Sequence, residues 1–394
     1  HVLVFLPGIG EIRRTEGLLR DNGADLHILH SSVPADEQDR ALRPSPRRKV
    51  ILATNIAETS LTIDGVRTVI DSGLVRVLIH DARLGIDRLE LRRISRSSAT
   101  QRAGRAGRTA PGRCLRLWTD AEQSALEEHA PPEIHLIDLS STVLTLRAYG
   151  VRDLARFNWY EPPRPENLAR AERFLAMLGA TDSDGSLSPL GRRLASLPLH
   201  PRLGRLLLAG ADAGFAREAA TLAALLSERD ILVSPHESRR REAAWEGTSD
   251  LLDRLEAFER ERHSSAFDAQ AMRAVERVRD DLTDLVRRQH DVPATPSLSR
   301  DETLRRALLL AYPDRVTVRR PHDPARGLMV GGRGIVLEPS SVVRRAPLFL
   351  SLDPRDPVSG DASESRVGLA SAVEEEWLEE CFPHLVERRL ASRF

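Results

Sequence analysis

Short apolar runs at regular intervals near the amino terminus constrain the fold of this chain most strongly. Four such runs, rich in Val, Ile and Leu, occur at Val2–Leu6, Leu26–Leu29, Val50–Ala53 and Val66–Ile70. Each run is followed by a polar or Gly-containing turn, and amphipathic stretches alternate with the runs. This alternation is typical of βαβ units, because neighbouring parallel strands need a long crossover connection. The pattern therefore predicts an α/β domain with a parallel sheet over residues 1–120.

Two changes in the pattern follow the fourth run. From Val75 onward apolar residues alternate with other residues on both sides of a turn at 81–85, which predicts an inserted β-hairpin at about 73–95. Ala130-Pro-Pro132 then marks a linker at 121–137, after which helical periodicity replaces the strand pattern.

Helical periodicity continues for about 160 residues. A helix that begins at Pro165 and stops at Gly179 has the usual order of Pro at the start and Gly after the end. With its neighbouring helices and a tight turn, this helix predicts a winged-helix domain over 138–202. The long amphipathic helices of 203–292 predict a helical bundle.

The last part of the chain, 293–394, returns to short strands separated by Gly and Pro. We expect a small OB-like β-barrel there, and we expect the chain to end before this region is complete. The predicted fold class is therefore multidomain, α/β plus α.

Composition excludes several classes of protein. Among 394 residues, 41% are hydrophobic and 29% are charged, and no apolar run approaches the roughly 20 residues of a membrane helix. Two cysteines far apart in sequence indicate neither a disulfide framework nor a cysteine-rich metal site. We therefore expect a cytoplasmic protein with no membrane partner and no metal ligands of its own. Lys49 is the only lysine among 58 basic residues, but base composition of the gene alone can cause such a bias toward arginine.

The sharpest local signal is Gln101-Arg-Ala-Gly-Arg-Ala-Gly-Arg108. In a helix the three arginines, spaced by three, would lie close to one face, and the interleaved small residues would let another surface approach. Arginine donates bidentate hydrogen bonds to phosphate oxygens and keeps its charge, so this arrangement suits a polyphosphate. The alternative is a basic surface helix, which Gly104 and Gly107 would destabilise by roughly 1 kcal/mol each relative to alanine.

A second signal, Ala53-Thr-Asn-Ile-Ala-Glu-Thr-Ser-Leu-Thr-Ile-Asp64, directly follows a predicted strand. Ligands of open parallel sheets bind at the carboxyl ends of strands, and hydroxyl and amide side chains bind sugar and phosphate groups. The alternative is a loop whose Thr59 and Ser60 only cap a helix.

These two segments together resemble the DEAH-type superfamily-2 helicases, whose motif five reads TNIAETSLT and whose motif six reads QRxGRAGR. Residues 2–12 and 30–38 are similar to two further helicase segments, the second of which meets the nucleic-acid backbone in that family. Residues 190–201, 221–230 and 308–314 resemble the bacterial HrpB-type branch more narrowly. The resemblance implies a second RecA-like lobe, a winged helix, a ratchet-like helical bundle and a partial OB-like barrel. It also places the family's strand-separating hairpin at 73–95.

Roles for individual residues follow from the motif match. As implied catalytic residues, Arg105 and Arg108 contact the γ-phosphate and Gln101 orients the attacking water. Asp64, Gly104 and Leu42 are implied to lie at the nucleotide, with Asp64 on the ribose. Leu42 stands where many relatives have an aromatic residue that stacks on adenine, so base stacking does not carry over. The implied RNA-binding residues are Thr54, Asn55, Thr62, Ser31 and Arg102.

The resemblance implies an ATP-dependent RNA helicase that moves along single-stranded RNA. No Gly-Lys-Ser/Thr phosphate loop exists in a chain whose only lysine is followed by Val50. We therefore expect ATP and Mg²⁺ to be held mainly by a first RecA-like lobe absent from this chain, and we expect the chain alone to be inactive. Two alternatives stay open at this point: a non-catalytic RNA- or protein-binding module, and a DNA helicase.

Overall fold

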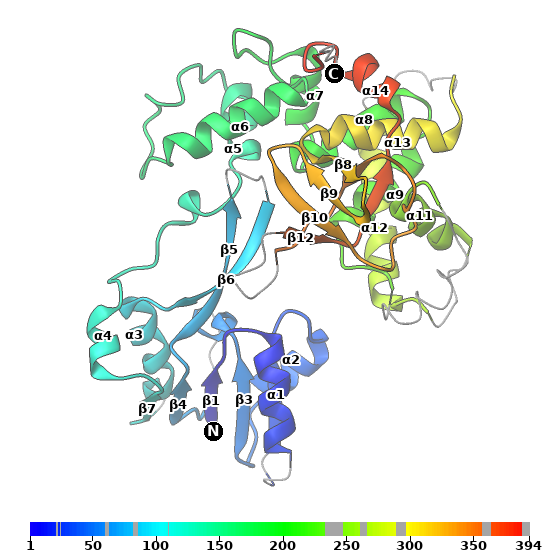
Figure 1. Ribbon diagram of the computed structural model, residues 1–394. Coiled ribbons are helices and arrows are strands. Elements are labelled where there is room, and N and C mark those ends of the chain that lie inside the picture. Colours follow the sequence, from blue (N-terminus) through cyan, green and yellow to red (C-terminus); the bar gives the residue numbers. More distant parts are fainter. Residues whose placement is uncertain are drawn as a thin grey trace. The chain divides into compact units, whose positions relative to one another are not determined.

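The computed structural model describes residues 1–20, 23, 25–59, 63–81, 86–108, 110–232, 247–260, 266–288, 297–356 and 364–387. It divides into two compact units, which are described separately (Figure 1). One unit consists of His1–Ile79 with Asp87–Ile137, and the other of His80–Ile86 with Asp138–Phe394.

The first unit is built on a parallel sheet of five strands in the order β2-β3-β1-β4-β7 (Figure 1). The strands are β1 Val2–Phe5, β2 Asp25–Leu29, β3 Lys49–Ala53, β4 Thr68–Asp71 and β7 Arg113–Arg116, and neighbouring strands pair in parallel. The predicted parallel sheet is confirmed. The sequence did not indicate β7, because Arg113-Cys-Leu-Arg116 has no β-branched residue and carries arginine at both ends.

Helices cover both faces of this sheet. They are α1 Ile9–Leu19, α2 Ala35–Leu42, α3 Arg96–Gly104 and α4 Asp120–Ala125, with short 3-10 helices η1 Asn55–Ala57, η2 Arg105–Gly107 and η3 Glu133–His135. Alternate residues of β1 face opposite ways. Leu3 and Phe5 pack in a core with Ala41 of α2 and Ala106 of η2, whereas Val4 packs in a second core with α1. Burial on both faces explains why the strands read as continuous apolar runs.

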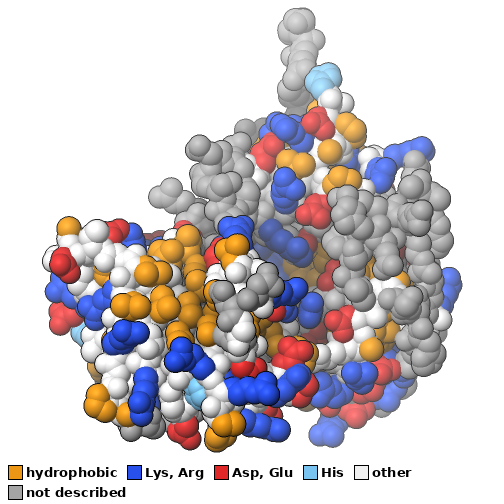
Figure 2. Space-filling view, turned by 90° about the horizontal axis from the view of Figure 1, so that it is seen from below, with side chains coloured by type: hydrophobic (Ala, Val, Ile, Leu, Met, Phe, Trp, Pro, Cys, Tyr) orange, Lys and Arg blue, Asp and Glu red, His pale blue; other side chains and the backbone are white. Residues whose placement is uncertain are grey.

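Two strands form a separate sheet inside the range where the sequence predicts a hairpin. They are β5 Leu74–Asp81 and β6 Ile86–Arg93, and they pair with each other. The connecting residues 82–85 lie outside the described residues. Leu89 and Leu91 of β6, like Leu115 and Leu117 at β7, are exposed. Figure 2 shows hydrophobic side chains gathered at the surface with basic side chains beside them.

From Asp138 onward the second unit has a run of helices, followed by a sheet and a last helix (Figure 1). Its helices are α5 Ser140–Ala148, α6 Pro165–Met177, α7 Pro189–Ala195, α8 Pro201–Asp212, α9 Ala216–Ser227, α11 Asp250–Arg260, α12 Ala269–Arg287, α13 Arg300–Ala311 and α14 Glu375–Cys381; the 3-10 helix η4 spans Pro313–Arg315. Three of these helices start at proline, and Gly150 and Gly179 follow helix ends with φ of 86° and 74°. The helix boundaries thus follow the Pro-first, Gly-after pattern.

The sheet of the second unit has six strands in the order β12-β10-β9-β8-β11-β13. The strands are β8 Val316–Arg320, β9 Asp323–Met329, β10 Arg333–Leu337, β11 Leu348–Ser351, β12 Glu364–Val367 and β13 Ala370–Ala372. β10 and β12 are parallel, and the other pairings are antiparallel. β12 and β13 are the two edges of this order, so the OB-like detail stays a prediction.

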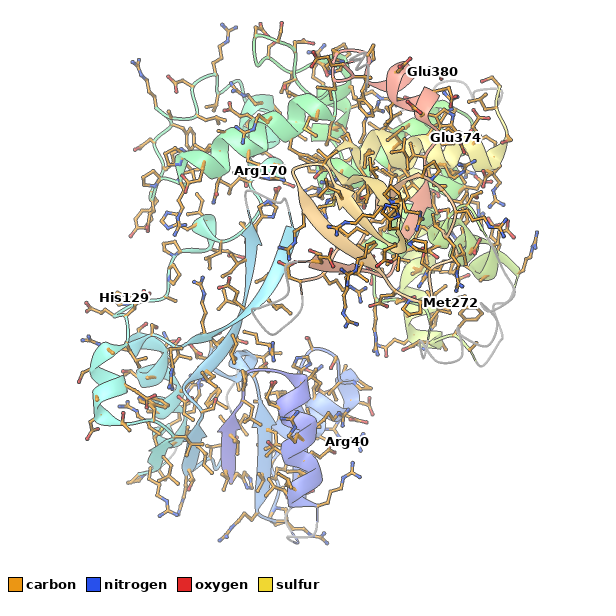
Figure 3. The ribbon with its side chains drawn as sticks, in the orientation of Figure 1. Arg40, His129, Arg170, Met272, Glu374 and Glu380 are labelled. Atoms are coloured by element: carbon orange, nitrogen blue, oxygen red, sulfur yellow. The ribbon has the colours of Figure 1, made fainter. Side chains whose placement is uncertain are left out.

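Charged side chains attach α14 to α13. Arg305 and Arg306 pair with Glu374 and Glu380, the two glutamates labelled in Figure 3. Both guanidinium groups also lie over the Trp377 ring, with distances of 4.7 and 5.1 Å from Cζ to the ring centroid. Cation–π contacts of this kind add to the ion pairs. Within the described parts of the chain, no helix is long and apolar enough to span a bilayer.

Candidate nucleotide and nucleic-acid site

The loop that follows β3 and the arginine motif of α3 and η2 pack against each other in the first unit. Glu58, in the loop, accepts a hydrogen bond from Arg102 (Nε to Oε2, 2.9 Å). Its other carboxylate oxygen accepts one from Ser98 (Oγ to Oε1, 2.5 Å). The two sequence motifs are therefore parts of one hydrogen-bonded assembly.

Arg102 lies in the interior of this assembly. Its side chain is 1% exposed, and its Nη1 donates to Asp71 Oδ1 at 2.9 Å. The guanidinium also lies over the Phe5 ring, 4.9 Å from the centroid. Two carboxylates and an aromatic ring compensate for the loss of water around this charge. The prediction that Arg102 contacts RNA does not fit this placement, because its donors face the core.

The three arginines of the motif do not share one exposed face. The α-helix changes to a 3-10 helix at Arg105, so the expected single helical face is interrupted. Arg102 and Arg105 are buried, whereas Arg108 is exposed. Gln101, the residue before Arg102, is exposed as well.

Arg105 is held by the backbone of the motif-five loop. Its side chain is inside the unit, and its Nη2 donates to the carbonyl oxygen of Glu58. Burial lowers the pKa of Arg105, and the charge of Arg108 lowers it further, whereas Glu58 raises it. Arginine nevertheless stays charged at neutral pH. Arg105 and Arg108 are thus two neighbouring cations, one docked and one at the surface.

Several predicted residues lie at the carboxyl edge of the parallel sheet. Thr54 and Asn55 directly follow β3, and Ser31 follows β2 by two residues. Asn55 and Ser31 are exposed, and Thr54 is buried. Thr54 makes no side-chain cap on η1, so helix capping does not account for it. Thr62 lies outside the described residues, as does Ser60 of the capping alternative.

The predicted nucleotide-binding residues belong to three different segments of the first unit. Asp64 is exposed in the turn before β4 and precedes Gly65, whose carbonyl oxygen accepts a hydrogen bond from the amino group of His1. This position is toward the amino ends of the strands, away from Thr54. Leu42 is half-buried and packs against the core of the sheet. Gly104 is exposed at the end of α3.

A pocket of about 680 Å³ opens beside the motif-five loop. Its polar lining includes Asn55, Glu58, Arg92, Arg93 and Ser98, and residues 125–136 supply much of the apolar lining. The pocket therefore joins the loop, the base of the β5–β6 sheet and the start of α3 within the first unit.

Two carboxylates that bond to the arginine motif were not singled out from the sequence. Glu58 was only one member of the matched motif, and Asp71 came directly after the predicted strand Val66–Ile70. The sequence pattern that could have identified them is a single carboxylate in an otherwise apolar or hydroxyl-rich segment. Such a carboxylate indicates a buried partner of opposite charge. No group of three or more His, Cys, Asp or Glu side chains in the described ranges is placed to hold a metal ion.

Comparison with protein families matches three parts of the chain. Residues 1–110 match the helicase conserved C-terminal domain. Residues 171–199 match the winged-helix part of the helicase-associated domain HA2, and residues 200–287 match its ratchet-like part.

Individual relatives agree with these matches. The chain is 35% identical over 368 residues to the pre-mRNA-splicing factor ATP-dependent RNA helicase prp22 of Schizosaccharomyces pombe, covering 87% of this chain and 31% of that protein. The crystal structure of the E. coli DExH-box NTPase HrpB superimposes with a TM-score of 0.78 at 32% identity, covering 98% of this chain and 44% of that one. A second structure, of the Escherichia coli DEAH/RHA helicase HrpB, gives a TM-score of 0.71 at 33% identity, with 89% and 41% covered.

The chain thus spans less than half the length of these relatives. The matched domains, the two motifs and the parallel-sheet lobe agree with one another. This chain belongs to the DEAH-type superfamily-2 helicases and is close to HrpB among them.

Proposed function

We propose that this chain forms the second motor lobe and accessory domains of an ATP-dependent RNA helicase that acts in the cytoplasm. The observation that carries the proposal is the direct packing of the motif-five loop on the arginine motif and the start of its helix, through Glu58, Arg102 and Ser98. A motor needs a physical link of this kind between its nucleic-acid contacts and its phosphate contacts.

In this proposal the exposed Arg108 and the docked Arg105 bind the γ-phosphate of ATP, and Gln101 orients the attacking water. Asp64 binds the ribose, with Gly104 and Leu42 beside the nucleotide. Ser31, Thr54, Asn55 and Thr62 contact the sugar–phosphate backbone of single-stranded RNA. Guanidinium groups stabilise the charge that develops on the transferred phosphoryl group, an effect of about 10³–10⁵-fold on rate.

The two motif glycines support an approach by another body. A Cβ added at Gly104 or Gly107 would meet no atom within 4 Å, and neither residue is among the glycines with positive φ. Neither local packing nor backbone conformation in the described part of the chain requires glycine there. Glycine at these two positions would instead leave room for a nucleotide and for a facing lobe. Such room is needed because closure around ATP brings phosphate close to the backbone.

The residues fit the phosphate part of an ATP site, and the magnesium part must come from elsewhere. Arginine and glutamine donors suit phosphate oxygens. Since the 394 residues contain no phosphate loop, we propose that a first RecA-like lobe of a longer protein holds the phosphates and Mg²⁺. Bound Mg²⁺ would neutralise phosphate charge, while this chain supplies the arginines.

The test is the substitution Arg108→Ala in a full-length protein that includes a first lobe. RNA-stimulated ATP hydrolysis should fall by about 10³-fold or more, with little change in thermal stability because the side chain is exposed. Arg113→Ala, at another exposed arginine of the same unit, is the matched control and should keep full turnover.

Other results would select other functions. Substantial turnover by the Arg108→Ala protein contradicts the arginine-finger role. RNA binding by a full-length parent without any ATPase activity would identify a non-catalytic binding module. Equal stimulation by single-stranded DNA and RNA of the same length would remove the RNA assignment, since only the 2′-hydroxyl distinguishes the two backbones.

A further inference from the structure

The structure points to Glu58 as a positioning residue that transmits RNA contact in the motif-five loop to Arg105; this role rests on the proposed function. Glu58 touches neither reacting group in the proposal. It acts instead through the arginine motif, which it holds at three places.

The three contacts are spread along α3 and η2, the two helices that contain the motif. Glu58 Oε1 accepts from Ser98 in the first turn of α3, and Oε2 accepts from Arg102 in its last turn. The backbone carbonyl oxygen of the same residue accepts from Arg105 in η2. A shift of Glu58 therefore moves the start, the end and the following turn of the motif together.

The contacts are strong because they are shielded and charged. The Glu58 side chain is 12% exposed, and Arg102 beside it is 1% exposed. Arg102 is shared with Asp71, the last residue of β4, so the assembly is attached to an inner strand of the parallel sheet. Charge-assisted hydrogen bonds in such surroundings are roughly twice as strong as neutral ones.

A rigid turn connects Glu58 to the proposed RNA contacts. The amide of Ala57 donates to the Thr54 carbonyl at 3.3 Å, and the amide of Glu58 donates to the Asn55 carbonyl at 2.9 Å. Thr54, Asn55 and Glu58 thus belong to one hydrogen-bonded 3-10 turn. Asn55, Glu58 and Ser98 also line the same pocket. A phosphate that pulls on Thr54 or Asn55 will therefore displace the carbonyl oxygen that holds Arg105.

This arrangement gives the two arginines different tasks. Arg108 is exposed and reaches phosphate by lobe closure alone, whereas the position of Arg105 depends on the RNA loop. Glu58 couples the position of Arg105 to the RNA loop, because its carboxylate holds Ser98 and Arg102 while its backbone carbonyl holds the guanidinium of Arg105. RNA-dependent stimulation of hydrolysis is the expected consequence.

The experiment uses the full-length protein and the substitution Glu58→Gln, which keeps the shape and removes the charge. ATP turnover is measured with and without single-stranded poly-U RNA, together with KM for ATP, RNA affinity and thermal stability. We expect stimulated kcat to fall about tenfold or more, while KM and RNA affinity change by less than about threefold. Unstimulated turnover should fall less, so the ratio of stimulated to unstimulated rate should decline.

Two further variants separate positioning from folding. Ser98→Ala removes one contact and leaves the Arg102 pair, so it should lower the ratio by a smaller factor without a loss of fold. Glu172→Gln breaks a glutamate–arginine pair of the second unit, with Arg147, and should leave the ratio unchanged. A merely structural role would lower thermal stability without changing the ratio in the folded protein.

The outcomes are distinct. Glu58→Gln and Ser98→Ala proteins that keep RNA stimulation within about twofold of the parent overturn the role of Glu58 while leaving the proposed function intact. A parent protein without RNA-stimulated turnover overturns the proposed function itself and the role of Glu58 with it.

Discussion

At the scale of single residues, the only lysine of the chain has a task that arginine cannot perform equally well. Lys49 is 3% exposed, and its Nζ donates to the carbonyl oxygens of Arg40 at 2.7 Å, Arg43 at 2.6 Å and Ala41 at 3.4 Å. These carbonyls belong to the last turn and the cap of α2, where Arg40 is labelled in Figure 3. A compact ammonium directs three donors at converging oxygens, whereas a guanidinium is a planar fork.

We therefore expect both Lys49→Arg and Lys49→Met to destabilise the first unit, by about 2 kcal/mol, because partly buried carbonyl groups lose their donor. Urea unfolding of the 394-residue chain measures the change. The neighbouring exposed Arg48 provides the control, since Arg48→Lys should change stability by less than about 0.5 kcal/mol. Unchanged stability of Lys49→Met would mean that the carbonyls find other partners.

At the scale of elements, a buried ion pair joins three helices of the second unit. Arg202 of α8 donates two hydrogen bonds to Asp314 of η4, at 2.7 and 2.9 Å. Its guanidinium lies between the rings of Phe174 of α6 and Tyr312, at 4.4 and 4.6 Å. Burial opposes ionisation of Asp314, but the charge and hydrogen bonds of Arg202 dominate and lower its pKa to about 2. Arg170, labelled on α6 in Figure 3, also favours the carboxylate.

Removal of one partner of this pair should lower the free energy of unfolding much more than removal of one partner of a surface pair with the same geometry. Asp314→Asn leaves the charge of a guanidinium that is only 12% exposed without its carboxylate, so we expect a loss of about 3 kcal/mol in the free energy of unfolding. Arg193 makes a similar bidentate pair with Asp212 of α8, but both side chains are more than a third exposed. Arg193→Gln should cost less than about 1 kcal/mol. Denaturant unfolding of both variants checks this, and equal losses would contradict the role of burial.

At the scale of the whole molecule, the 394 residues contain the arginines proposed to bind phosphate but no phosphate loop. We expect this chain by itself to release no phosphate from ATP, with or without single-stranded RNA, because half of the required contacts are missing. A phosphate-release assay beside a full-length protein provides the measurement and its control. Turnover by the isolated chain that Arg108→Ala abolishes would show that the chain completes the site unaided.

Local sequence patterns determined the parallel sheet, the Pro-first helices and the two motifs. Strand and helix periodicity act over a few residues, so they can be read without knowledge of distant partners. The same patterns could not reveal β7, whose arginine-rich residues become a strand only by pairing with β4. They also suggested a partial OB-like barrel in the region where the described residues form a six-stranded sheet with β12 and β13 at the ends of the strand order, and that barrel stays a prediction.

Only the tertiary structure decided what the side chains of the site do. Spacing by three suggested that Arg102, Arg105 and Arg108 share a face, but Glu58 and Asp71, which lie 44 and 31 residues from Arg102, draw it into the core. The partners of a charged side chain are set by the fold and not by its neighbours in sequence. For that reason the sequence by itself identified the motif, while the structure determined that its arginines are one anchor, one docked cation and one exposed cation.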